Sequence, residues 1–155
     1  DLTLSVNSRR AFLKGAELLS RRAHGKAELT RKLMQKYPRE CAEQAADKLE
    51  KLGLINDGEF ADMLAQELYT HRKYGVSRVK QELLRRGIDR ALAEEAAERL
   101  DKDDLNRIIL LLQTKYRNNL GDEKGIIRTK NSLLRLGYSY SDIRAAFESI
   151  ENESF

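Results

Sequence analysis

The stretch HRKYGVSRVKQELLRRGID, residues 71–89, decides how this chain is organised. It is rich in basic residues and contains Gly75, which has counterparts fifty residues away on either side, at Gly25 and Gly125. Downstream of these glycines, an apolar pair, basic residues and a second glycine recur in register. The corresponding positions are Leu33–Met34, Leu83–Leu84 and Leu133–Leu134, Arg78 and Arg128, Lys80 and Lys130, Arg85 and Arg135, and Gly87 and Gly137. A self-similar period of this length is typical of repeat proteins, whose units pack mainly on their neighbours.

Three repeat units are therefore expected, over residues 1–55, 56–102 and 103–155. In the middle unit, Phe60, Leu64 and Leu68 recur every four residues, which places them on one face of a helix. The predicted fold class is all-α, with three helices in each unit. The sequence predicts helices near 8–23, 26–36 and 39–52, near 56–72, 76–87 and 89–100, and near 103–118, 124–136 and 140–151.

The fifty-residue repeat also predicts helix caps and buried positions. Gly87 is expected to end the second helix of the middle unit as a C-terminal glycine. Its buried stripe is expected to consist of Val76, Val79, Leu83 and Leu84. Asn56 and the pair Ser139 and Asp142 read as helix N-caps. Gly25, Gly75 and Gly125 read as N-caps or bends, and the apolar run at residues 108–112 is expected to bury more than one face.

Amino-acid composition also bears on the fold class and on the localisation of the protein. Charged residues make up 35% of the chain and aromatic residues only 6%, with no Trp, which favours small cores of Leu and Ala. One Pro and few β-branched runs argue against a sheet. No apolar run approaches the roughly 20 residues needed to span a bilayer, and the first residues lack the apolar core of a secretion signal. The single cysteine, Cys41, suits a reducing cytosol, so a cytoplasmic protein is expected.

Charge is sorted by helix. Basic residues gather on the second helices and the segments that precede them, whereas acidic residues gather on the third helices. Arg78 and Arg85 are seven residues apart, so both point away from the apolar stripe, and Arg128 and Arg135 repeat the arrangement. Such a row fits a polyanion or an acidic protein surface, because the planar arginine fork donates paired hydrogen bonds to phosphate or carboxylate. Tyr74 could stack on a base or pack as a hinge residue.

The residues expected to contact a partner or DNA lie mostly on or beside the second helices. They are Arg21, Arg22, Arg31, Lys32, Arg72, Lys73, Tyr74, Arg78, Lys80, Gln81, Arg85, Arg86, Arg128, Lys130 and Arg135.

Three segments resemble one known family. GLINDGEFA (53–61) followed by HRKYGVSRVKQELLRRGI (71–88) is similar to the hallmark of the RecX family, bacterial regulators of the RecA recombinase. LLSRRAHGKAELTRKL (18–33) resembles that family's first block, and LLRLGYSYSDI (133–143) carries the weaker match of the third unit. The chain departs from the family at Val76, where proline is frequent, and at Asp122-Glu123, where the middle unit has Arg72-Lys73.

The resemblance implies an elongated, curved array that lies in the groove of a RecA–single-stranded-DNA filament. There it would block filament extension and reduce ATP hydrolysis, strand exchange and co-protease activity in recombination and SOS-linked DNA repair. The implied partners are the RecA filament, the single strand within it and, weakly, free DNA. The resemblance also implies a monomer that is not an enzyme, that binds no cofactor or metal and that does not associate with a membrane.

Other functional classes would each require sequence features of their own. Catalysis finds no support, because His24 and His71 lack ligand spacing and read as surface residues near helix ends, and Cys41 reads as a half-buried helix residue. A duplex-DNA binder with tandem helix-turn-helix units would need basic third helices, and these are acidic. A scaffold of helical repeats is the third class, and it leaves the aligned arginines unexplained.

Overall fold

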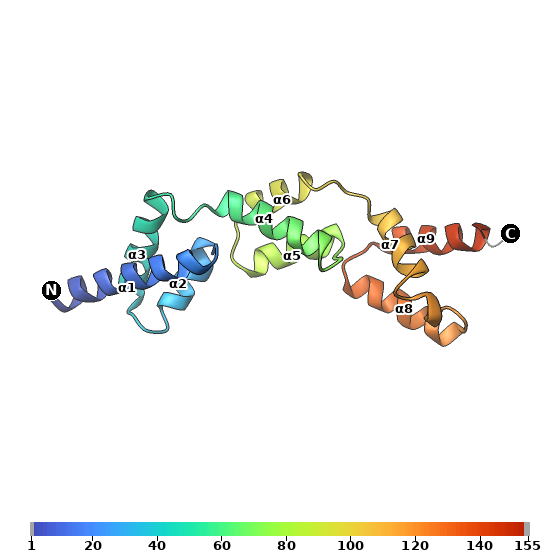
Figure 1. The fold of residues 1–155 in the computed structure, drawn as a ribbon, viewed down its shortest axis with the longest axis horizontal. Helices are drawn as coiled ribbons and strands as arrows, with labels where there is room; N and C mark the ends of the chain where they lie inside the picture. Colours follow the sequence, from blue (N-terminus) through green and yellow to red (C-terminus); the bar gives the residue numbers. More distant parts are fainter. Residues whose placement is uncertain (1, 154–155) are drawn as a thin grey trace. The chain divides into compact units, whose positions relative to one another are not determined.

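The computed structural model describes residues 2–153, and within that range it holds nine α-helices, one 3-10 helix and no strand (Figure 1). This confirms the all-α fold class. The elements are α1 (Leu2–Arg21), α2 (Lys26–Leu33), α3 (Arg39–Lys51), α4 (Asp57–Thr70), α5 (Val76–Arg85), α6 (Arg90–Glu98), α7 (Asp104–Gln113), the 3-10 helix η1 (Arg117–Asn119), α8 (Glu123–Arg135) and α9 (Tyr140–Glu153). Within residues 2–153, no helix combines the length and the hydropathy that crossing a bilayer requires.

The helices form two compact units. The first unit consists of Asp1–Leu64 and Leu83–Ala96, and the second unit consists of Ala65–Glu82 and Ala97–Phe155. Each unit thus combines one terminal set of three helices with part of the middle set. The repeat boundaries at 55/56 and 102/103 stay a prediction.

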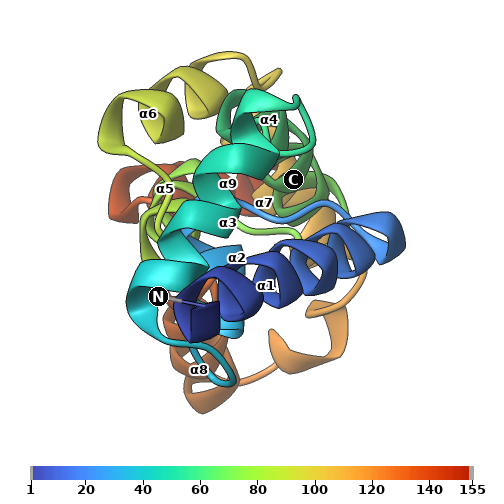
Figure 2. The same ribbon diagram turned by 90° about the vertical axis from the view of Figure 1, so that its left-hand side faces the viewer.

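The core of the first unit lies where α1 and α2 pack against α3 (Figure 2). Small side chains on α3, namely Ala42, Ala45 and Ala46, are buried beside Leu49, and they let the helices approach closely. Cys41 is completely buried, so the expectation of a half-buried thiol is wrong. Its Sγ lies 3.6 Å from the carbonyl oxygen of Leu4, which the early part of α1 brings over it.

The first helix begins earlier than expected. The sequence predicts a start near residue 8, whereas α1 begins at Leu2. No Gly or Pro interrupts the stretch LTLSVNS, and Leu4 packs against the core of the first unit. This tertiary contact stabilises a turn that local sequence signals do not mark.

The core of the second unit lies where α7 and α8 pack against α9. Ile108, Leu111 and Leu112 are buried and Ile109 packs beside them, which confirms a broad buried face on α7. Only Leu110 of this apolar run is largely exposed, at 59%.

The same helix also ends earlier than expected, at Gln113 instead of residue 118. The hydroxyl of Thr114 donates to the carbonyl of Leu110 at 2.7 Å. The backbone N–H of Thr114 bonds to Leu111 instead, at 3.3 Å, because the side chain competes for the carbonyl that would continue the helix.

Most of the predicted caps are confirmed. The Asn56 side chain accepts from the N–H of Glu59 at 3.1 Å, and the Ser139 hydroxyl accepts from the N–H of Asp142 at 3.1 Å. Gly25 is the N-cap of α2, but Gly125 lies inside the first turn of α8. Asp122 caps α8 instead, since its side chain accepts from the N–H of Gly125 at 2.8 Å.

The glycines that end α5 and α8 have positive φ, +88° at Gly87 and +97° at Gly137, which confirms their role as C-terminal glycines. Each also lies against the preceding second helix. A Cβ on Gly87 would lie 2.5 Å from the Cβ of Ala27 in the first unit. A Cβ on Gly137 would lie 2.7 Å from the backbone nitrogen of Arg78 in the second unit. Successive second helices therefore touch at a glycine in both units.

An aspartate reinforces each of these contacts. Asp57 begins α4, and its Oδ1 accepts from the backbone N–H of Lys26, the first residue of α2, at 2.8 Å. Asp104 begins α7, and its Oδ2 accepts from the N–H of Val76, the first residue of α5, at 3.3 Å. Each carboxylate satisfies an N–H that has no partner within its own helix and faces the positive end of the helix dipole.

Leu83 and Leu84 provide a matched pair that tests the buried face of α5. Leu83 is completely buried, as predicted, whereas Leu84 is 38% exposed, so its place in the predicted stripe is wrong. Adjacent positions point about 100° apart on a helix, and here Leu83 faces the core whereas Leu84 faces outward. We expect Leu83→Ala to lower the free energy of unfolding by about 2–5 kcal/mol and Leu84→Ala by less than about 1 kcal/mol, measured by urea unfolding. Equal losses for the two variants would show that this face is assigned incorrectly.

Gly137 and Gly53 separate backbone strain from close packing. Both have positive φ, but a Cβ on Gly53 would meet nothing within 4 Å. Gly53→Ala should therefore lose only the roughly 1–2 kcal/mol of a left-handed alanine. Gly137→Ala should lose about 1–3 kcal/mol more, because backbone atoms of Arg78 cannot move aside cheaply. Equal urea midpoints for the two variants would contradict the close contact.

Candidate nucleic-acid and partner interface

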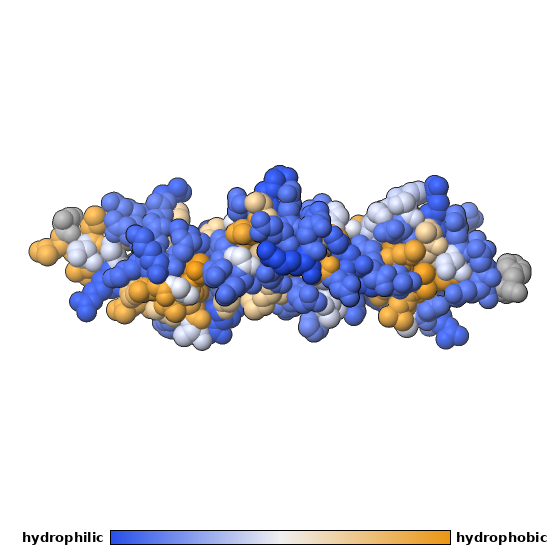
Figure 3. Space-filling model, turned by 90° about the horizontal axis from the view of Figure 1, so that it is seen from above, coloured by the Kyte–Doolittle hydropathy of each residue, from blue (hydrophilic) through white to orange (hydrophobic). Residues whose placement is uncertain are grey.

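The predicted contact residues differ in how far they reach into solvent. Nine are exposed: Arg21, Arg22, Arg31, Arg72, Lys73, Gln81, Arg85, Arg128 and Arg135. Six are half-buried: Lys32, Tyr74, Arg78, Lys80, Arg86 and Lys130. The hydrophobic patches in Figure 3 lie among hydrophilic residues, which cover most of the face in view. The predicted residues are thus surface groups, and several also hold the fold together.

Four of the predicted arginines come together in the first unit. Arg22, Arg31, Arg85 and Arg86 line one pocket of about 320 Å³, and Glu28 is its remaining lining residue. Arg31 extends from α2, whereas Arg85 and Arg86 lie at the end of α5 and just beyond it. The contact between Gly87 and Ala27 brings these two elements together.

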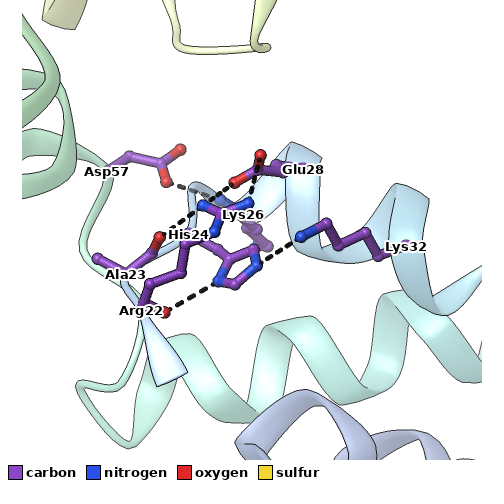
Figure 4. Close-up of polar contacts among 7 residues, drawn as sticks. All are labelled: Arg22, Ala23, His24, Lys26, Glu28, Lys32 and Asp57. Atoms are coloured by element: carbon purple, nitrogen blue, oxygen red, sulfur yellow. Dashed lines mark hydrogen bonds and ion pairs between the residues drawn. The ribbon is translucent and has the colours of Figure 1, made fainter. Parts of the chain in front are cut away.

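Glu28 is held by Arg22 through both carboxylate oxygens, at 3.1 and 3.2 Å (Figure 4). Burial raises the pKa of Glu28, but the hydrogen bond and the positive charge of Arg22 outweigh it and keep the pKa below its ordinary value. Glu28 is therefore ionised near neutral pH. It neutralises one of the four guanidinium groups around the pocket.

His24 lies beside this ion pair and is only 3% exposed, so the expectation of a surface histidine is wrong. Its Nε2 lies 2.9 Å from the Lys32 ammonium, and its Nδ1 lies 3.0 Å from the carbonyl of Arg22 (Figure 4). An ammonium can only donate, so Nε2 accepts and the proton of the neutral ring sits on Nδ1. His24 thus orients Lys32 and the turn between α1 and α2.

Burial lowers the pKa of His24, the hydrogen bond to the Arg22 carbonyl partly opposes this, and the charges of Arg22 and Lys32 lower it further. Protonation therefore favours the unfolded chain. The contribution of His24 to stability is complete above its unfolded pKa of about 6.5 and is lost as the pH falls towards the lower folded value.

We expect urea unfolding to show a fall in stability as the pH drops below about 6.5, and this fall should disappear in His24→Gln, which cannot titrate. The carboxyls with lowered pKa, Glu28 and Asp47, lose their contributions only at lower pH. An unchanged pH profile in His24→Gln would rule out this assignment.

Arg78 is held within the second unit. Its guanidinium lies 4.3 Å from the centre of the Tyr74 ring and donates to the carbonyl of Arg135 at 2.5 Å. The Tyr138 hydroxyl also donates to the carbonyl of Lys73 at 2.5 Å. Tyr74 thus packs against Arg78 of α5, and Arg78 in turn bonds to the last turn of α8.

Gln81 and Arg135 come together in the second unit, where they line a pocket of about 380 Å³. Arg135 also donates to the Ser132 hydroxyl at 3.2 Å. Lys130 lies over the ring of Phe147, 5.0 Å from its centre, and this contact accounts for its partial burial. Arg72, Lys73, Lys80 and Arg128 line neither of these two pockets.

The acidic residues of the third helices face solvent almost without exception, which leaves them on the surface as the charge pattern predicts. In the first unit they also bind the second helix, because Lys26 pairs with Asp47 at 2.7 Å and with Glu50 at 3.0 Å. The hydrogen bonds that Lys26 donates to these two carboxylates raise the pKa of Lys26, and the bond to Asp47 lowers the pKa of Asp47.

Sequence reasoning missed several residues that position the surface. Besides His24, these are Asp57, Asp104, Tyr69 and Arg107. The Tyr69 hydroxyl donates to Asp104 at 2.9 Å, and Arg107 stacks on Tyr69 at 3.6 Å and donates to its carbonyl. A signal was present for the aspartates, since both begin the first helix of their set. In residues 2–153, no cluster of three or more His, Cys, Asp or Glu residues could hold a metal ion.

Known proteins resemble the chain in sequence and in fold. A family model described as "RecX, first three-helix domain" matches residues 11–49, and one described as "RecX, second three-helix domain" matches residues 56–96. "Regulatory protein RecX" of Trichlorobacter lovleyi is 34% identical over 146 residues, covering 88% of this chain and 93% of that protein. The same-named protein of Amycolatopsis mediterranei is 30% identical over 126 residues, covering 79% and 72%. The crystal structure of RecX from Lactobacillus salivarius shares the fold, with a TM-score of 0.79 at 22% identity over 95% of this chain and 98% of that one.

Proposed function

Because this chain belongs to the RecX family of regulatory proteins, we propose that it is a negative regulator of the RecA recombinase. It lies in the groove of the filament that RecA forms on single-stranded DNA and blocks extension of that filament. ATP hydrolysis, strand exchange and co-protease activity fall as a result, in recombination and in SOS-linked repair. It acts as a cytoplasmic monomer.

The proposed mechanism is that the chain occupies the groove of the filament. Three repeats of three helices, over 1–55, 56–102 and 103–155, meet successive protomers of the filament. Weak contacts made by several repeats at once add up through effective concentration, as in other multivalent binders. Gly87 and Gly137 recur fifty residues apart and each lies against a second helix within its own unit, which supports the repeated design.

The basic second helices supply the chemistry of the contact. Exposed arginines there donate paired hydrogen bonds to the phosphates of the strand or to the carboxylates of RecA. The exposed acidic side chains of the third helices would repel phosphates, so the third helices face away from DNA. This charge distribution is the observation that favours a filament regulator over a tandem helix-turn-helix protein bound to duplex DNA.

Two pairs of arginines test this assignment in a RecA ATPase assay on single-stranded DNA. The wild-type chain should inhibit hydrolysis with increasing concentration. One variant replaces Arg128, on α8, and Arg72, in the segment before α5, by Ala. It should raise the concentration needed for half inhibition roughly tenfold or more, about 1.4 kcal/mol. Both side chains are exposed, so the fold should be unchanged.

The matched control replaces Arg90 and Arg144 with Ala. These arginines are also exposed, and replacing them removes the same charge, but they belong to the third helices α6 and α9. The control should inhibit almost as well as wild type. No inhibition by the wild-type chain would exclude the proposed function. Equal losses in both variants would exclude the second helices and the segments before them as the contact surface.

A further inference from the structure

A groove runs between the first and third helices of the first unit, α1 and α3, which lie side by side in Figure 2. It has a volume of about 550 Å³. Its lining residues are Ser5, Ser8, Arg9, Phe12, Leu13, Gln44, Ala45 and Lys48. None of them belongs to a second helix, so the groove is distinct from the basic surface that is proposed to contact the filament.

The lining residues of α1 follow the spacing of one helix face. From Ser5 to Leu13 they stand at positions i, i+3, i+4, i+7 and i+8, so the groove extends over two helical turns, about 12 Å. Leu13, Val6 and Leu2 are exposed, at intervals of seven and four residues, and they continue an apolar row towards the start of α1. A second helix laid along α1 would cover this row, because anchors at such intervals share one face.

Each polar side chain in the lining is a hydrogen-bond donor, and none is a carboxylate. The Ser8 hydroxyl donates to Oε1 of Gln44 at 2.9 Å, which leaves the amide nitrogen of Gln44 to donate. Within residues 2–153, Arg9 and Lys48 form no ion pair. The Lys48 ammonium lies over the ring of Phe12 instead, 4.8 Å from its centre. The groove therefore combines two unpaired positive charges with an apolar surface.

The nearby carboxylates of α3 do not neutralise these charges. Asp47 and Glu50 pair with Lys26 of α2, at 2.7 and 3.0 Å. Lys48 follows Asp47 directly, so the two side chains point about 100° apart on the helix. The third helix of the first unit thus presents acidic side chains to α2 and a cation to the groove.

The other two repeats do not carry this set of side chains. Ala45, Ala96 and Ala146 correspond in the repeat, and Arg9 corresponds to the residues fifty and one hundred positions later. The positions that answer Arg9, Phe12, Gln44 and Lys48 are Glu59, Asp62, Glu95 and Arg99 in the middle repeat and Ile109, Leu112, Ala145 and Ser149 in the third. Acidic residues prevail in the middle repeat and the third has no charge there, so the positive groove belongs to the first repeat.

We propose that the groove between α1 and α3 binds an acidic amphipathic helix of a partner protein. Apolar side chains of that helix pack on Leu13 and along the row towards Leu2, and its carboxylates pair with Arg9 and Lys48. Nucleic acid is a poorer occupant, because a phosphate backbone would leave the apolar row uncovered. The interaction goes beyond the proposed function, since it uses no residue of the second helices.

Fluorescence anisotropy of a labelled model helix tests this groove without RecA. The probe has about 18 residues, long enough to form a helix, with Leu at every third or fourth position and Glu on either side of that row. The full chain should bind this acidic probe, and replacing each Glu of the probe by Gln should weaken binding roughly tenfold. No binding of the acidic probe by the wild-type chain would overturn the proposal.

Two pairs of substitutions test the charges. Arg9→Gln combined with Lys48→Gln should weaken binding of the acidic probe roughly tenfold and leave binding of the Gln probe unchanged, because the lost contact is the one between the charges. The matched control, Arg10→Gln with Lys51→Gln, removes one exposed cation from each of the same two helices, outside the groove. It should bind the acidic probe within about twofold of wild type. Equal weakening by the two pairs would reduce the interaction to net charge and overturn the site.

Leu13 and Leu52 test the apolar part of the groove. They are 58% and 59% exposed, but Leu52 follows the end of α3 and does not line the groove. Leu13→Ser should weaken binding of the acidic probe roughly tenfold, since the variant no longer buries a leucine against the probe. Leu52→Ser should bind as wild type does, and circular dichroism should show that both variants are folded. Unchanged binding by Leu13→Ser would contradict an amphipathic partner.

A labelled oligothymidine distinguishes a protein partner from nucleic acid. Its binding should not change in Arg9→Gln with Lys48→Gln. If the oligonucleotide loses affinity as strongly as the acidic probe does, the groove takes phosphate and the proposal is wrong. Neither assay contains RecA, so the result is independent of whether the chain inhibits ATP hydrolysis.

Discussion

The close approach of successive second helices at a glycine is the constraint on which the rest of the structure depends. A side chain at Gly87 would collide with Ala27, and one at Gly137 would collide with the backbone of Arg78. Because there is no room for a side chain at these two glycines, the surrounding side chains have fixed neighbours. Asp57 and Asp104 complete the junctions by accepting from the first N–H of the preceding second helix. The same geometry places arginines from two helices around one pocket in the first unit.

Sequence periodicity predicted the features that local backbone rules determine. The glycines that end helices, the caps at Asn56 and Ser139 and the burial of Leu83 could all be read from spacing. Features that depend on tertiary contacts could not. The early start of α1 depends on Leu4 packing into a core. The exposure of Leu84 depends on which face of α5 the surrounding helices cover.

The candidate site also has some features that the sequence predicted and others that depend on tertiary contacts. Repetition identified the basic second helices, but it could not reveal that Arg78 bonds to the carbonyl of Arg135 or that Lys32 bonds to a buried histidine. The pocket of four arginines was also beyond sequence reasoning, since Arg31 is more than fifty residues from Arg85 and Arg86. Repeats of one design therefore carry unequal surfaces.

The most direct test of this account is a cryo-electron microscopy map of the chain bound to a RecA filament on single-stranded DNA, at a resolution that separates helices. The account predicts density within the filament groove, with α2, α5 and α8 facing the strand and RecA and the acidic third helices turned away. Density confined to the outside of the filament, or third helices facing the DNA, would contradict it.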